Sequence, residues 1–203
     1  MIETYTLIII VITAVVTIAA FNSEELMGKL ILYPRYMDSP AEYYRFLTSG
    51  FIHADWMHLF FNMYAFFIFG KLVETVFAMW GKHDMYIVMY LAAIVVGSLP
   101  SFYKNRHNSY YRALGASGGV SAILFSFIYY SPWSLIYIWF IPCPAILAGV
   151  GYLVYSAYMS GKGRDNIGHD AHFWGAIVGL IFTFIYDPFH GQNFIMQLMN
   201  PHF

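Results

Sequence analysis

Long apolar runs, separated by short polar or proline-containing segments, make up most of this chain of 203 residues. Six runs approach the ~20 residues that a helix needs to cross a bilayer. They are residues 4–21, 57–79, 84–103, 117–130, 143–159 and 171–186. Because these runs are continuous rather than alternating, they predict helices and not the strands of a membrane barrel. We therefore predict an all-α membrane protein in which residues 1–203 form a single transmembrane domain.

Two of the connections between these runs are unusual. Residues 22–56 are too long for a plain turn. Their mixture of aromatic and charged side chains predicts a structured loop that rests on the membrane interface. Residues 133–141 are apolar but flanked by Pro132, Pro142 and Pro144, so we expect an extended connector at the membrane face.

Composition supports a membrane protein and excludes some other classes. The chain is 60% hydrophobic and only 10% charged, whereas a soluble domain has about 25% charged residues. The formal net charge of −1 does not suggest a nucleic-acid partner. Cys143 is the one cysteine, which excludes a disulfide within the chain.

Polar side chains interrupt the apolar pattern at three places that should lie close together. His58 and Asn62 begin the second predicted span, Ser117 begins the fourth and His172 begins the sixth. Even-numbered spans of a serpentine chain run in the same direction, so their first turns lie near the same membrane face. His58 and Asn62 are four residues apart and share one helix face. The sequence thus gathers a serine, two histidines and an asparagine in one leaflet.

Small residues near these positions predict close packing of the fourth and sixth spans. Ser117 lies in the sequence GASGG, and the sixth span carries Ala171, Gly175 and Gly179 at four-residue steps. Such stripes let helices approach closely, which would bring Ser117 within reach of His172. The fourth span covers only about 20 Å of a hydrocarbon core about 30 Å thick. We therefore expect residues 112–116 to enter the membrane without being helical, and Ser117 to lie at the floor of an aqueous pocket.

The serine, the two histidines and the asparagine are residue types that nucleophilic catalysis uses. A serine hydroxyl needs a base, and histidine is the usual one, so Ser117 is the candidate nucleophile and His172 the candidate general base. His58, Asn62 and the Ser117 backbone N–H are candidate donors to an oxyanion. Asp170 is interpreted as a helix cap, which leaves a Ser–His dyad rather than a triad.

Each residue also has a structural interpretation. Asn62 alone could join two helices by a hydrogen bond, and the glycines of GASGG could serve helix packing. Glu74 is interpreted as structural. Four further histidines are interpreted as membrane-interface residues: His83, His107, His190 and His202. The constellation of four polar groups near one membrane face favours a functional site over four separate structural roles, because intramembrane polar groups are functional candidates.

Three motifs resemble the rhomboid family of intramembrane serine proteases, in its bacterial type with a six-transmembrane core. They are HADWMHLFFN from His53, GASG from Gly115 and AHFWGAIVG from Ala171. The resemblance implies the catalytic and oxyanion roles given above, with His53 as a polar support. It also implies supporting roles for Gly115, Gly118, Gly175 and Gly179. It implies a serine endopeptidase that cleaves single-span membrane proteins in the lipid bilayer, with no cofactor, no metal and no nucleic-acid partner.

The chain departs from the family pattern in two ways. Ser121 falls where many relatives carry an aromatic side chain that packs on the base. Its absence is expected to loosen His172 or widen the pocket, which leaves space for another group to pack there. The resemblance also implies a multi-pass protein of a bacterial inner membrane, with the site open to the extracytoplasmic side. That orientation puts most Lys and Arg residues outside, against the positive-inside rule.

Two alternatives to a protease are considered, of which the second comes from another class of protein. The first is a catalytically silent rhomboid-like binder of membrane proteins, which the presence of both Ser117 and His172 disfavours. The second is a metal-binding or transport protein that uses His53, His58 and His172. No carboxylate or thiolate completes a convincing ligand set on that face, and the HExxH signature of zinc proteases is absent.

Overall fold

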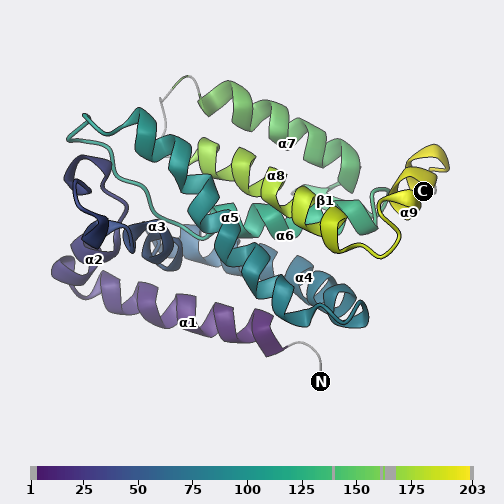
Figure 1. Ribbon diagram of the computed structural model, residues 1–203, viewed down its shortest axis with the longest axis horizontal. Coiled ribbons are helices and arrows are strands. Elements are labelled where there is room, and N and C mark those ends of the chain that lie inside the picture. The colour runs from purple at the N-terminus through teal and green to yellow at the C-terminus, as the bar shows by residue number, and fades with distance from the viewer. Residues whose placement is uncertain (1–3, 139, 161, 163–167, 202–203) are drawn as a thin grey trace.

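A computed structural model describes residues 4–138, 140–160, 162 and 168–201. In Figure 1 the long helices run back and forth as a bundle, with α2 and α3 at one end and α9 at the other. The elements are α1 (Thr4–Phe21), α2 (Glu24–Leu30), η1 (Pro34–Tyr36), η2 (Pro40–Glu42), α3 (Arg45–Thr48), η3 (Ser49–Phe51), α4 (Trp56–Met79), α5 (His83–Lys104), α6 (Ser117–Tyr130), β1 (Leu135–Ile138), β2 (Ile141–Pro144), α7 (Ala145–Ser160), α8 (His169–Tyr186) and α9 (Gln192–Met199).

Three of the described helices are long and apolar enough to cross a membrane by length and composition, namely α1, α4 and α5. Helices α6 and α7 are apolar but shorter, and α6 has only 14 residues. At about 1.5 Å per residue, α6 begins below the surface of a bilayer if its far end reaches the opposite face. The helix bounds lie within two residues of the ranges that the apolar pattern predicts.

The proline-flanked segment before α7 is extended, but it is also paired, which the sequence did not predict. Strands β1 and β2 form an antiparallel hairpin in which Ile136 lies opposite Cys143. Helix α7 therefore begins at Ala145 and not at Cys143. The prolines favour extended backbone in the residues before them. The first amides of α7 donate to carbonyl groups ahead of the hairpin, from Ala145 to Ser134 at 2.9 Å and from Ile146 to Pro132 at 2.8 Å.

The segment between α1 and α4 is structured and has a small core of its own. Leu32, Met37 and Phe46 are buried with Phe102 of α5. The guanidinium of Arg45 donates from Nη1 to the carbonyl oxygens of Gly28 at 2.6 Å and Ile31 at 3.0 Å. These contacts fix the loop to the end of the bundle at which α4, α6 and α8 begin.

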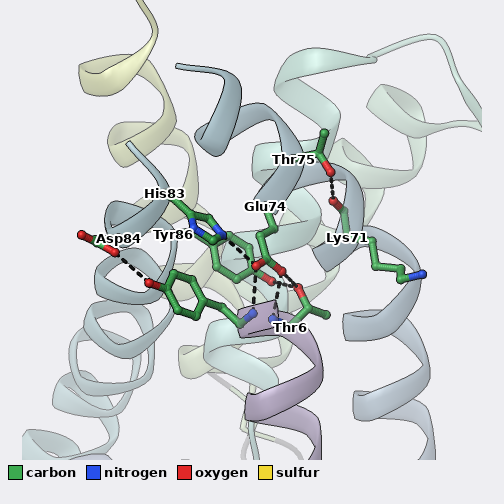
Figure 2. Close-up of polar contacts among 8 residues, drawn as sticks. Thr6, Lys71, Glu74, Thr75, His83, Asp84 and Tyr86 are labelled. Carbon is green, nitrogen blue, oxygen red and sulfur yellow. Dashed lines mark hydrogen bonds and ion pairs between the residues drawn. The ribbon is translucent and has the colours of Figure 1, made fainter. Parts of the chain in front are cut away.

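At the opposite end of α4, the buried carboxylate of Glu74 holds the first turn of α1 (Figure 2). Its oxygens accept hydrogen bonds from the backbone N–H groups of Tyr5 at 2.8 Å and Thr6 at 2.9 Å. The Thr6 hydroxyl donates a third at 2.6 Å and His83 Nε2 a fourth at 2.8 Å. N–H groups of a first helical turn have no partner inside their own helix, so Glu74 caps α1 from a neighbouring helix. His83 is thus part of a polar cluster and not only an interface residue.

Replacing Glu74 by glutamine is expected to destabilise the bundle. The amide keeps only one acceptor oxygen, and its NH₂ group would face N–H donors. Losing hydrogen bonds to a charged, buried group should lower the free energy of unfolding by about 2 kcal/mol. Thermal unfolding in detergent would measure this. Glu25→Gln is the matched control, because Glu25 is exposed and its ion pair with Lys29 lies on one face of α2; equal stabilities of the two variants would contradict the capping role.

Candidate active site

The segment that leads into Ser117 is held in a non-helical conformation by the loop between α1 and α4. Leu32 and Ala113 exchange two backbone hydrogen bonds of 3.0 Å, and the Gly115 N–H donates to the Ser49 carbonyl at 2.9 Å. Gly115 has a φ of +122°, which favours glycine. Helix α6 then begins at Ser117, which is half-buried. Ser117 therefore lies in a first turn, where free N–H groups and the helix dipole favour negative charge.

His53 connects this segment to α1 and is fully buried. Its Nε2 accepts a hydrogen bond from the Ala116 N–H at 3.3 Å, so this nitrogen carries no proton. Its Nδ1 then donates to the Thr17 hydroxyl at 3.1 Å, and that hydroxyl donates to the Phe51 carbonyl at 3.1 Å. Burial, together with the neighbouring His58, lowers the pKa of His53 to about 3. His53 is therefore neutral at physiological pH and supports the residue before Ser117.

The His58 and Asn62 side chains lie where α4 meets the same segment. The Asp55 carboxylate caps α4 by accepting from the His58 N–H at 2.8 Å. The His58 ring lies so close to Gly115 that a Cβ there would be 2.8 Å from its Nε2. Asn62 is buried, with 8% exposed. Its Nδ2 donates one hydrogen bond to the His58 carbonyl at 2.9 Å, which leaves the second N–H of the amide for another acceptor.

Helices α6 and α8 are in direct backbone contact along the small-residue stripe. A Cβ on Gly175 would lie 2.9 Å from the Gly118 Cα, and one on Gly179 would lie 2.6 Å from the Ala122 Cα. A Cβ on Gly118 would lie 3.5 Å from the Ala171 carbonyl oxygen. This packing brings the first turns of α6 and α8, which carry Ser117 and His172, against each other.

A cavity of about 30 Å³ lies beside Ser117. Serine side chains make part of its wall, together with Gly118 and Ala171. The polar lining consists of Ser49, Ser98, Ser101 and Ser117. A cavity of this volume has room for about two water molecules, and apolar side chains such as Leu32 and Ile94 complete its wall. The aqueous pocket at the depth of Ser117 stays a prediction.

Asp170 is not the cap of α8, contrary to the sequence-based interpretation. Helix α8 begins at His169 with Gly168 at the N-cap position, so Asp170 lies within the first turn. Its carboxylate pairs with Lys104 Nζ at 2.8 Å and accepts from the Ser101 hydroxyl at 3.3 Å. The carboxylate thus joins α8 to the end of α5.

The sequence did not identify Tyr152 of α7, whose ring stacks on the imidazole of His172. The two ring centroids are 5.5 Å apart and the planes differ by 22°. The Tyr152 hydroxyl and the Ser121 Oγ are hydrogen-bonded at 2.7 Å. The small side chain of Ser121 was the available signal, because it leaves the space beside His172 for a group from another helix.

A rhomboid domain model matches residues 40–189. The chain belongs to the rhomboid family. Family membership, together with the apolar helices, confirms the predicted helical membrane bundle. The matched region contains every residue of the candidate site, from His53 to Gly179.

Three curated relatives are similar to this rhomboid chain. RHOMBOID-like protein 12, mitochondrial, of Arabidopsis thaliana is 29% identical over 180 residues, which cover 79% of this chain and 51% of that protein. Rhomboid protease GlpG of Haemophilus influenzae is 27% identical over 159 residues, 77% of this chain and 76% of that protein. Rhomboid-like protein 11, chloroplastic, of Arabidopsis thaliana is 29% identical over 170 residues, 76% of this chain and 56% of that protein. The matched region thus spans about half the length of the two plant relatives.

Proposed function

We propose that this rhomboid is an intramembrane serine endopeptidase that hydrolyses a peptide bond in or beside a transmembrane segment of a membrane protein. The observation that carries the proposal is the packing of the first turn of α6, which begins with Ser117, against that of α8, which carries His172. A cavity partly lined by serine side chains lies beside Ser117. The name of the Haemophilus relative, a rhomboid protease, is consistent with it.

In the proposed mechanism His172 takes the proton of the Ser117 hydroxyl as the oxygen attacks the substrate carbonyl. The carbonyl oxygen becomes an oxyanion, which accepts hydrogen bonds from the Ser117 N–H, His58 and the free N–H of Asn62. The intermediate collapses, the C–N bond breaks, and His172 gives its proton to the leaving amine. A water molecule from the cavity then attacks the acyl-enzyme and gives a proton to His172. As this second intermediate collapses, the bond between the acyl carbon and Ser117 Oγ breaks, His172 returns the proton to Oγ, and the carboxylic acid is released.

The hydrogen bonds of His53 disfavour the alternative in which three histidines bind a metal. The Ala116 N–H occupies the lone pair of Nε2 and the Thr17 hydroxyl occupies Nδ1, so His53 offers no free ligand atom. His53 instead supports the nucleophile segment as a neutral ring. We propose that Gly115 and Gly118 allow the close approach of His58 and α8 that the site needs.

The proposed substrates are single-span membrane proteins that enter from the lipid bilayer. The proposed orientation has the N-terminus of α1 on the cytoplasmic side of a bacterial inner membrane and the site open to the other side. Arg45 is one basic residue of the outer loop whose charge is bound to Glu42 and backbone carbonyl groups, with only 13% of its side chain exposed. Lys29 and Arg35 of the same loop are exposed, so the proposed orientation opposes the positive-inside rule.

Covalent labelling tests the proposal directly. The purified protein in detergent should cleave a model single-span substrate in the presence of EDTA, and a fluorophosphonate probe should inhibit the cleavage. Peptide mass spectrometry should find the adduct on Ser117. Unfolded protein, which lacks the oriented base, is the control and should not be labelled. Cleavage that EDTA abolishes, or inhibition without an adduct on Ser117, would contradict a serine mechanism.

A further inference from the structure

Three helices meet at the ring of Tyr152. The residue belongs to α7, its ring stacks on His172 of α8, and its hydroxyl is hydrogen-bonded to Ser121 of α6. Ser121 lies one helical turn after Ser117, on the same face of α6. The oxygen of Ser121 is buried with 2% of the residue exposed, so the hydrogen bond between the two hydroxyl groups is shielded from solvent.

We propose that Tyr152 is a positioning residue that holds the imidazole of His172 in the plane required for proton transfer with Ser117. The inference rests on the proposed protease function. An imidazole on a single side chain can rotate about two bonds, and a parallel aromatic ring restricts this rotation to one plane. The Ser121 hydroxyl restrains the aromatic ring in turn. The interaction of an aromatic pair, beyond its buried area, favours one ring orientation by about two- to tenfold.

The position of α7 therefore controls the alignment of the base. Helix α7 lies at one side of the bundle, next to α8 (Figure 1). Its outer face is exposed at Leu147, Val150 and Val154, whereas Gly149 and Tyr152 face the bundle. If α7 moves away from α6 and α8, the ring leaves His172 and the restraint on the imidazole is lost. Tyr152 restrains the base while α7 is packed against its two neighbours, and the ring of His169 meets the same imidazole edge-on from α8, with centroids 5.8 Å apart.

Kinetics of four variants test the positioning role. Tyr152→Leu is expected to lower kcat about tenfold with little change in KM, because substrate contacts are kept while base alignment is lost. Tyr152→Phe and Ser121→Ala retain the ring but lose its tether, so a smaller decrease of about two- to threefold is expected. Tyr158→Leu is the matched control, since Tyr158 lies on the exposed face of the same helix, and its kcat should equal that of the parent.

An exchange variant separates positioning from general packing. Ser121→Tyr combined with Tyr152→Ser moves the ring from α7 to α6 and reverses the two hydroxyl partners. We expect the exchange to restore kcat to within about threefold of the parent, whereas Ser121→Tyr alone should be impaired because two rings would compete for one space. Failure of the exchange together with parent-like stability would contradict the proposal.

A spectroscopic measurement keeps this inference distinct from the proposed function. In protein labelled with ¹³Cε1-histidine, the His172 resonance is assigned from its loss in His172→Gln. Its ring-current shift should be lost in Tyr152→Leu and kept in Tyr152→Phe and Tyr158→Leu. An unchanged shift in Tyr152→Leu, or a lost shift with unchanged kcat, would overturn the positioning role. Absence of a Ser117 adduct would instead overturn the protease function on which it rests.

Discussion

Ser117→Ala, His172→Ala and the double variant are expected to lower kcat/KM for a single-span substrate by the same large factor, about 10⁴ or more. The reason is that nucleophile and base act as one unit. A serine without its base is not activated, and a base without the serine has no proton to accept. The measurement is the initial rate of cleavage on a gel, with the protein in detergent and in liposomes.

Two controls are matched to this dyad. Ser126→Ala removes a buried hydroxyl further along α6 that accepts a hydrogen bond from Thr183 at 2.7 Å, and His107→Ala removes an exposed histidine. Both should cleave within about threefold of the parent, as substitutions away from the reacting groups usually have small effects. If the two single effects multiply in the double variant, the residues act in separate steps and the dyad is wrong.

The positions of α1, α4, α5, α6, α7 and α8 were predictable because each one is a continuous apolar run with clear limits. Ser117 and Tyr130 bound α6 in both the pattern and the structure. The close packing of α6 on α8 was also predictable, because the stripe of Ala171, Gly175 and Gly179 indicated where α8 packs; the meeting of the Ser117 and His172 side chains stays a prediction. The backbone contacts of Gly175 and Gly179 with α6 agree with that prediction.

Contacts made by side chains from unrelated parts of the chain were not predictable. The four donors to Glu74 come from α1 and α5, and nothing local to Glu74 specifies them. Tyr152 is one aromatic residue among many in an apolar run, so its stacking on His172 depends on how α7 packs. The pairing of β1 with β2 was missed for a related reason, since prolines weaken a strand pattern although they are compatible with an edge.

Gly175→Ala is expected to impair both stability and activity, because no side chain can be accommodated between α6 and α8 at this point. The added Cβ would lie 2.8 Å from the Gly118 carbonyl carbon and 2.9 Å from its Cα. These are backbone atoms and cannot rotate away, so the two helices must separate. Overpacking of this kind costs about 3 kcal/mol of folding free energy. Displacing Ser117 from His172 by about 1 Å should lower kcat/KM about 100-fold.

Gly151→Ala is the matched control for this prediction. Nothing lies within 4 Å of a Cβ at Gly151 in α7, and alanine favours a helix over glycine by about 0.5–1 kcal/mol. Thermal unfolding and cleavage rates should therefore show a slightly more stable, active Gly151→Ala beside a destabilised, nearly inactive Gly175→Ala. If Gly175→Ala kept the activity of the parent, Ser117 and His172 would not depend on close contact between α6 and α8. The small-residue stripe would then serve packing alone, and the geometric basis of the proposed dyad would be lost.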